Sequence, residues 1–142
     1  MGDYLDLIYH QYQSFFEQLT DESVEEFREF ASTNVRYRDP FVDARNVDDA
    51  VVYLHKTFKD LDDIRFVMKG HARNGYVFYQ YSQMTFRLKR LPQKLWQLDM
   101  MSKIIFNDEG KLIDHSDYWD ASPLFESFPL LGKSITLIKK LT

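Results

Sequence analysis

The hydrophobic period changes near residue 60, and this change constrains the fold more than any other feature of the chain. Before that point apolar residues recur every three or four positions, the period of a helix that buries one face. After it, apolar and polar residues alternate over long runs that turn signals separate, which is typical of half-buried strands. Helices first and antiparallel strands afterwards predict an α+β domain in which a curved sheet wraps the helices.

Three helices are predicted in the first part of the chain. Ser23 and Glu26 have the spacing of a capping box, which predicts a second helix that includes Ala31. Asn46 is expected to cap a third helix. Between them, the segment before Pro40 is expected to be extended, because proline disfavours helix at the preceding residue. The apolar faces of the first and third helices are Leu5, Ile8, Tyr12, Phe15, Phe16 and Leu19, and Val47, Ala50, Val51, Leu54 and Phe58.

The second part predicts an antiparallel meander. Its expected strands begin near Ile64, Tyr76, Leu95 and Leu112, and its expected turns are Asn74-Gly75, Leu91-Pro92-Gln93 and Asn107 to Gly110. Alternation places Trp96, Leu98, Met100 and Ser102 on one face and Asp99 and Lys103 on the other. On the last strand it groups Ile113, His115, Asp117 and Trp119 on one face, and Leu112, Asp114, Ser116 and Tyr118 on the opposite one.

Composition excludes several classes of protein. The chain is 44% hydrophobic and 28% charged, as expected of one folded domain over residues 1–142. It contains no Cys, which excludes disulfides and thiolate chemistry and makes a cytoplasmic location the default expectation. The net charge of −4 argues against nonspecific nucleic-acid binding. His10, His55, His71 and His115 lack a ligand spacing, so no metal and no cofactor are expected.

Two short acidic strings are the strongest functional signals. Asp39-Pro40 follows an extended apolar segment, and Asp117-Tyr118-Trp119-Asp120 ends the last strand. A carboxyl group held beside bulky apolar side chains can have a pKa raised toward the working range of a general base. Because the strings lie far apart in sequence, only the fold could bring them to one cavity.

The order of elements, together with three motifs, resembles the nuclear transport factor 2-like superfamily. The motifs are Arg38-Asp39-Pro40-Phe41, Met101 to Phe106 with the Asn107 to Leu112 turn, and Asp117 to Asp120. Within the superfamily the chain is similar to the SnoaL-like group and to ketosteroid isomerases. The resemblance covers about residues 5–128 and implies a cone of helices wrapped by a curved sheet, with an open mouth for a small hydrophobic ligand. Residues 129–142 are expected to form a C-terminal helical extension, similar to that of a bacterial subgroup.

The resemblance implies roles for several residues. Asp39 stands at the position of the isomerase base, Tyr12 or Tyr9 at that of the tyrosine that donates to the substrate oxygen, and Ser102 at that of a second donor. If Trp119 faces the cavity, as the resemblance suggests, alternation places Asp117 and His115 on the same face, where they could act as assisting groups. The expected ligand contacts are Tyr12, Trp96, Met100, Ser102 and Trp119. Each acid also has a structural interpretation, since Asp39 could cap the Pro40 turn and Asp117 could bond a neighbouring strand.

Two classes of function follow from these expectations. One is a binding or assembly module with a small hydrophobic ligand and no turnover, and the other is an isomerase, cyclase or hydratase that uses Asp39 as base. A homodimer through the outer sheet face is expected, because Tyr79, Tyr81 and Leu95 are opposite in parity to the core residues. For the basic C-terminal helix, packing on the domain or on a partner is favoured over contact with a membrane.

Overall fold

The computed structural model describes residues 2–127 and 129–141 of the 142-residue chain. Its helices are α1 (Gly2–Glu17), the 3₁₀ turn η1 (Val24–Glu26), α2 (Phe27–Phe30), α3 (Val47–Asp60), α4 (Ser122–Glu126) and α5 (Pro129–Leu141). Its strands are β1 (Ala31–Asp39), β2 (Val42–Ala44), β3 (Leu61–Asn74), β4 (Val77–Leu88), β5 (Leu91–Phe106) and β6 (Leu112–Tyr118). The predicted α+β class is confirmed.

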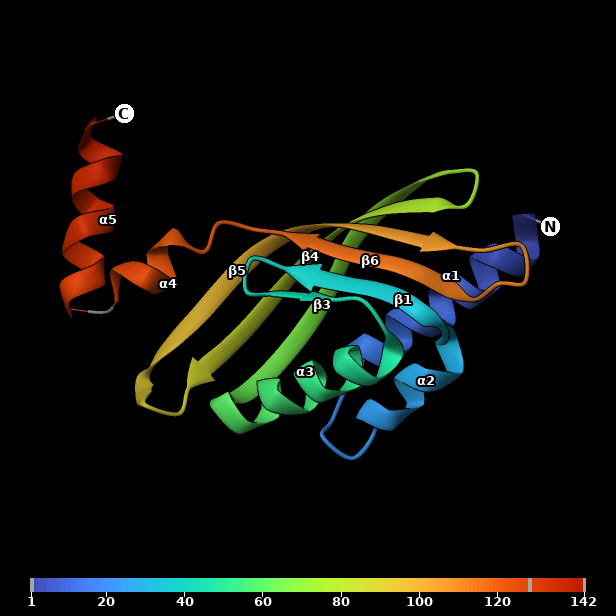
Figure 1. Ribbon diagram of the computed structural model, residues 1–142, viewed down its shortest axis with the longest axis horizontal. Helices are drawn as coiled ribbons and strands as arrows, with labels where there is room; N and C mark the ends of the chain where they lie inside the picture. Colours follow the sequence, from blue (N-terminus) through green and yellow to red (C-terminus); the bar gives the residue numbers. More distant parts are fainter. Residues whose placement is uncertain (1, 128, 142) are drawn as a thin grey trace.

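All six strands form one sheet in the order β2-β1-β6-β5-β4-β3. The β3 to β6 meander is antiparallel, as predicted, and β1 joins it by pairing in parallel with β6. Figure 1 shows α1, α2 and α3 gathered beside the same part of the sheet, while α4 and α5 continue past the end of β6 at the opposite end of the molecule from the N-terminus. The β1–β6 pair brings the ends of both strands, and with them the two acidic strings, to one place.

Aromatic side chains fill the space between the helices and the sheet. Tyr9 and Tyr12 of α1 pack with Phe27, Phe78 and Phe106, and all five are fully buried. Removing each such ring from water stabilises the fold by about 1.5–3 kcal/mol. A second apolar cluster covers the other half of the sheet and consists of Met84, Phe86, Leu88, Trp96, Leu98 and Met100. Helix α1 covers the first cluster, and the second one borders the cavity described below.

The capping box predicted at Ser23 and Glu26 is wrong. Ser23 makes no side-chain cap, and its hydroxyl accepts a hydrogen bond from the backbone N–H of Thr20 at 2.9 Å instead. Serine competes for nearby backbone groups in this way and favours turns over helix. Only a 3₁₀ turn and one short helix follow, and Ala31 begins β1 rather than extending the helix.

The Asn46 cap is confirmed. The Asn46 side chain accepts a hydrogen bond from the backbone N–H of Asp49 at 2.8 Å, and Asp48 and Asp49 lie in the first turn of α3. Acidic groups at a helix N-terminus interact favourably with the helix dipole. This cap fixes the start of α3, whose last turns form a wall of the cavity.

Two predicted turns lie elsewhere than expected. Asn74 pairs with Val77, so the first loop is Gly75-Tyr76, and Gly75 adopts a φ of +62° at the first loop position. This is the glycine position of a type II′ turn. The Leu91-Pro92-Gln93 turn is wrong, because Leu91 pairs with Leu88 and the loop is Lys89-Arg90. Residues 92–95 bulge out before pairing resumes at Trp96, which explains how a proline is accommodated.

A bulge also changes the face of one residue on β6. Phe106 pairs with Leu112 and Ile105 pairs with Asp114, so Ile113 has no partner in the register. Leu112 is buried in the core and Ile113 is 38% exposed. The expectation that Ile113 shares the inner face with His115 is therefore wrong, because the extra residue reverses the alternation at this point.

The C-terminal helix begins at Pro129, earlier than the predicted start near Lys133. Its main contact is α4, and in Figure 1 it projects away from the sheet. Leu137, Ile138 and Leu141 are 59%, 60% and 77% exposed. No helix in the described part of the chain is long and apolar enough to cross a membrane.

Candidate functional site

A cavity of about 710 Å³ lies between α3, the inner face of the β3–β5 sheet and α4. Most of its wall is apolar, from strand residues Ile64, Phe66, Met84, Phe86, Leu88, Leu98 and Met100 and from Leu124 and Phe125 of α4. The cavity exists because α1 and α3 cover only part of the concave sheet. Such a concave apolar site with a few polar groups is the usual form of a small-molecule site.

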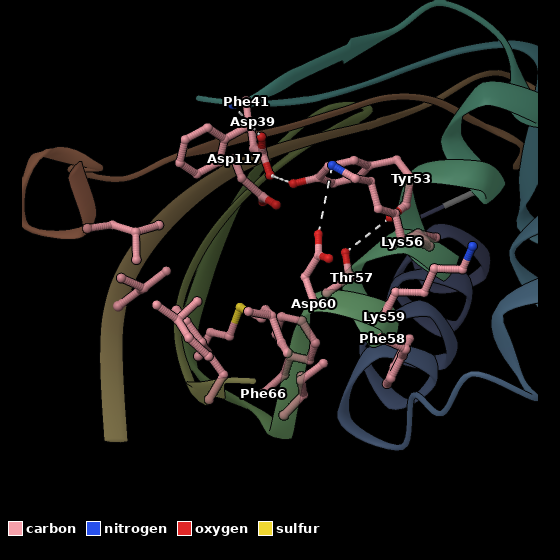
Figure 2. Close-up of a pocket in the computed structure, with 18 of the residues that line it drawn as sticks. Asp39, Phe41, Tyr53, Lys56, Thr57, Phe58, Lys59, Asp60, Phe66 and Asp117 are labelled. Atoms are coloured by element: carbon pink, nitrogen blue, oxygen red, sulfur yellow. Dashed lines mark hydrogen bonds and ion pairs between the residues drawn. The ribbon is translucent and has the colours of Figure 1, made fainter. Parts of the chain in front are cut away.

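The polar groups gather where β1 and β6 end. Asp39 and Asp117 both line the cavity, together with Tyr37 and Tyr53. Figure 2 shows the two carboxyl groups on the same side, with the Tyr53 hydroxyl directed at Asp39. The parallel pairing of Arg38 with Ser116 makes Asp39 and Asp117 the next residues along two neighbouring strands.

Asp39 accepts three hydrogen bonds. One carboxylate oxygen accepts the backbone N–H groups of Phe41 at 2.7 Å and Val42 at 3.1 Å, and the other accepts the Tyr53 hydroxyl at 2.5 Å. Burial raises the pKa of Asp39, the hydrogen bonds oppose that rise, and the nearby charge of Asp117 adds to it. Asp39 is thus both the cap of the Pro40 turn and a buried acid with a raised pKa.

Asp117 ends a buried chain of hydrogen bonds. One of its oxygens accepts the Ser102 hydroxyl at 2.5 Å and lies 2.8 Å from Nε2 of His115, whose Nδ1 lies 2.6 Å from the Tyr12 hydroxyl. Burial raises the pKa of Tyr12 well above its ordinary value, so the Tyr12 hydroxyl keeps its proton and can donate a hydrogen bond to Nδ1. Nε2 then carries the ring proton and donates to Asp117.

This chain of hydrogen bonds leaves the second carboxylate oxygen of Asp117 for the cavity. The second oxygen of Asp117 receives no hydrogen bond from any described residue, although the side chain is only 12% exposed. Tyr37 is similar, because its hydroxyl makes no hydrogen bond within residues 2–127 and 129–141 while the residue lines the cavity. A bound molecule could engage both of these polar groups without breaking an existing hydrogen bond.

The structure brings four of the predicted site residues to the cavity wall: Asp39, Met100, Asp117 and Trp119. The other four lie behind it. Tyr12, His115 and Ser102 are buried and reach the cavity only through Asp117. Trp96 stacks on Phe86 inside the second apolar cluster, and its indole N–H has no partner among the described residues.

The inner face of β5 follows the predicted alternation. Leu98, Met100 and Ser102 are buried and Asp99 is exposed. Tyr9, the alternative donor, lies in the core on Phe78 and donates to Gln80 at 2.9 Å. Neither Tyr9 nor Tyr12 lines the cavity, because both rings point from α1 into the aromatic core.

Sequence reasoning missed several residues of the wall. Tyr53 lies on the apolar side of α3, and its role depends on how α3 crosses β1. Phe41 packs against Trp119 and Phe125 at centroid distances of 5.5 and 5.3 Å, which joins the Asp-Pro turn, the end of β6 and α4. The aromatic residues after each acidic string were the signal for this contact, but alternation stops at a strand end and cannot orient them.

Charged residues surround the rim. Lys56, Lys59 and Asp60 come from the end of α3, and Lys89 and Arg90 come from the β4–β5 loop. Lys56 is 68% exposed and lies 3.8 Å from Asp60, and Lys89 donates to the Phe58 carbonyl at 2.9 Å. Nowhere in the described chain do three or more His, Asp or Glu residues form a group that could hold a metal ion.

Comparison with known proteins identifies the fold. No protein-family model and no curated protein matches the chain. Among solved structures, a proposed SnoaL-like polyketide cyclase from Jannaschia sp. has a TM-score of 0.72 at 12% identity, over 82% of this chain and 88% of its own. A hypothetical protein of ketosteroid isomerase-like fold from Catenulispora acidiphila, solved with trimethylamine, gives 0.69 at 11%, over 81% and 86%.

An LEH-like epoxide hydrolase from M. tuberculosis covers more of this chain, with a TM-score of 0.67 at 14% identity over 94% of this chain and 96% of its own. At such identities the likeness shows the fold and does not transfer an activity. Another neighbour is a nuclear transport factor 2-like protein from Exiguobacterium sp., with a TM-score of 0.68 at 12% identity over 80% of this chain and 98% of its own. The chain therefore has the nuclear transport factor 2-like fold shared by SnoaL-like and ketosteroid isomerase-like proteins.

Proposed function

We propose that the protein binds a small hydrophobic molecule in the cavity between α3, the sheet and α4. The observation that carries this proposal is an apolar cavity of about 710 Å³ that closes on two carboxyl groups at one end. Burying the surface of an apolar ligand contributes roughly 25 cal/mol per Å². The few polar groups would fix its orientation.

The structural neighbours support a small-molecule site. The Catenulispora protein was solved with trimethylamine, and other neighbours are a proposed cyclase and an epoxide hydrolase. Their names differ in chemistry but agree on small organic molecules. We infer the same class of ligand here, with Asp39, Met100, Asp117 and Trp119 as contact residues.

Tryptophan fluorescence tests binding directly, because the chain contains only Trp96 and Trp119. Trp96→Phe leaves Trp119, on the cavity wall, as the sole reporter. We expect 1-adamantanol, a compact apolar cage, to change Trp119 emission with saturation. The matched variant Trp119→Phe should report much less, since Trp96 does not line the cavity. A Trp119 signal that stays flat to the solubility limit would contradict the proposal.

A second candidate is an enzyme that moves a proton next to a carbonyl. The favouring observation is a buried acid of raised pKa beside a second carboxylate with an unbonded oxygen. The C–H bond would break, its proton would pass to a carboxylate, and the electron pair would move onto the carbonyl oxygen as an enolate. Tyr37, whose pKa burial raises, would keep its proton and donate a hydrogen bond to that oxygen.

The hydrogen bonds now favour Asp117 over Asp39 as the base, because Asp39 already accepts three of them. Deuterium exchange into cyclohexanone, followed by NMR in D₂O, separates the candidates. A positioned base contributes about 100- to 10,000-fold in rate. If the enzyme proposal holds, Asp117→Asn lowers the exchange by that factor and Asp39→Asn lowers it less. If the wild-type protein exchanges deuterium into cyclohexanone no faster than buffer does, the enzyme proposal is wrong and only the binding function remains.

A further inference from the structure

We propose that the ligand of this cavity carries a positive charge, as a protonated amine or quaternary ammonium group on an apolar body, held between Asp117, Asp39 and the surrounding aromatic rings. The inference rests on the proposed binding function and adds the charge of the ligand to it. The cavity is the site, and its polar end determines which charge it accepts.

The first argument is the charge at that end. Asp39 and Asp117 share one cavity and each is largely removed from water, yet neither forms an ion pair with a lysine or arginine within the described residues. The hydrogen bonds of Asp117 come from the Ser102 hydroxyl and the His115 ring, and both involve the same carboxylate oxygen. A buried charge without a counter-charge is unfavourable, so a cationic group of a ligand would be stabilised at this end of the cavity.

The free oxygen of Asp117 gives that cation a defined place. Its partner oxygen is held by two donors, which fix the carboxyl group, and the second oxygen is left toward the cavity. A fixed carboxylate oxygen binds an N⁺–H donor more strongly than a neutral one. Because the carboxyl group is already oriented by the Ser102 and His115 bonds, a ligand amine would not have to order it.

The second, independent argument is the aromatic lining around the carboxyl groups. The ring centroids of Tyr37 and Tyr53 lie 6.1 Å apart and those of Phe41 and Trp119 lie 5.5 Å apart, and all four residues line the cavity. Aromatic faces attract organic cations, and aromatic residues are the usual lining of sites for quaternary ammonium groups. An anionic ligand would instead be repelled by both carboxylates and by the negative faces of the same rings.

The rim lysines do not supply the missing charge. Lys56 is exposed, and the carboxylate nearest to it, 3.8 Å away, is that of Asp60 rather than Asp39 or Asp117. Lys89 is held by the Phe58 carbonyl and lies 3.8 Å from Asp62. Neither lysine forms an ion pair with Asp39 or Asp117, and ion pairs between exposed side chains such as these contribute little. The carboxyl groups therefore act on a ligand at short range, with no lysine or arginine of the described residues paired to them.

Three molecules with the same cage and different charges test the inference: 1-adamantylamine, 1-adamantanol and 1-adamantanecarboxylate, measured by calorimetry at pH 7 and moderate salt. We expect the protonated amine to bind about tenfold tighter than the alcohol, the size of one charged hydrogen bond. The carboxylate should bind more weakly than the alcohol. Binding of the alcohol as tight as that of the amine would overturn this inference and leave the proposed function standing, whereas no binding of any of the three would overturn both.

A matched pair of variants assigns the effect to the cavity. Asp117→Asn keeps an oxygen that can accept from Ser102 and His115, so the fold is expected to persist, and it should remove most of the preference for the amine over the alcohol. Asp114→Asn removes the same charge from β6, at a residue that does not line the cavity and pairs with Lys103 at 4.0 Å, and should leave the preference unchanged. An equal loss in both variants would show that only the overall charge matters and would contradict the site.

Discussion

Asp39 combines a structural and a chemical property in one side chain. It accepts two backbone N–H groups of the Pro40 turn and the Tyr53 hydroxyl, so it connects β1 to the following turn and to α3. At the same time its pKa is raised by burial and by Asp117. Substitutions at this residue therefore have to separate loss of structure from loss of charge.

Asp39→Ala removes all three hydrogen bonds and leaves two part-buried donors, the Val42 N–H and the Tyr53 hydroxyl, without partners. We predict a loss of about 1–3 kcal/mol in the free energy of unfolding, measured in urea. Asp39→Asn keeps an oxygen for the two backbone N–H groups and should lose clearly less. As a control, Asp120→Ala frees an exposed Ser122 N–H that water can satisfy, and should cost less than Asp39→Ala. An Asp39→Ala protein as stable as the wild type would contradict the role in the turn.

The charge of Asp117 should be measurable in the titration of Asp39. We predict a pKa of Asp39 above its ordinary value of about 3.9, measured from the carboxyl carbon shift by NMR. Asp117→Asn removes one cause of the rise, so the pKa of Asp39 should move back down. An unchanged value would show that the two carboxyl groups do not interact.

The raised pKa of Asp39 also predicts a pH dependence of stability. Between its unfolded and folded pKa values, the folded protein binds more protons at Asp39 than the unfolded chain does. The contribution of Asp39 to stability is therefore fully present below the unfolded pKa and is lost as pH rises through the folded pKa. In urea unfolding at several pH values, the stability of the wild type relative to Asp39→Asn should fall over this window. A relative stability that rises instead would have the wrong sign.

At the scale of elements, local signals identified α3 and most of the meander, because their information is contained in a few neighbouring residues. The Asn46 cap needs only Asn46 and the backbone N–H of Asp49. The parallel pairing of β1 with β6 could not be predicted in the same way, since it joins residues about 80 positions apart and leaves no local pattern. The same limit explains why the bulge at Ile113 was not predicted, since alternation within one strand cannot reveal it.

The α3 cap allows an element-scale prediction. Asn46→Ala should lower the free energy of unfolding by about 1 kcal/mol, because the N–H of Asp49 loses its acceptor. Asn46→Ser retains an acceptor and should recover most of that loss. Since α3 carries Tyr53 and the rim of the cavity, Asn46→Ala should also weaken binding of 1-adamantanol slightly. Equal stability of the alanine and serine variants would rule out the cap as the cause.

At the scale of the whole molecule, residue type and parity indicated the cavity wall only where strands stay regular. Met100 follows from alternation on β5, whereas Tyr53 and α4 enter the wall through packing between elements that no single segment encodes. Trp96 shows that correct parity alone does not place a residue on the cavity wall. It has the predicted parity and is buried in the second apolar cluster, but it does not line the cavity.

The outer face of the sheet predicts self-association. Tyr81, Met101 and Tyr118 lie side by side across β4, β5 and β6 and are 39%, 53% and 51% exposed. We propose that a second copy of the chain covers this row, since neighbouring exposed apolar side chains can form a protein–protein interface. Sedimentation at micromolar concentration should then show a dimer of the 17.0 kDa chain, and Met101→Glu should shift it to monomer. Leu137→Glu in α5 is the control, and a wild-type protein that sediments only as monomer would contradict the dimer.

Binding in the cavity is the central claim, and methionine methyl NMR tests it most directly. The chain has five methionines, of which Met84 and Met100 line the cavity and Met101 faces outward on the sheet. In a titration with 1-adamantylamine, the methyl signals of Met84 and Met100 should shift together and saturate with one dissociation constant, while that of Met101 stays in place. Saturable shifts at Met101 alone, or none at Met84 and Met100, would contradict a ligand site in this cavity.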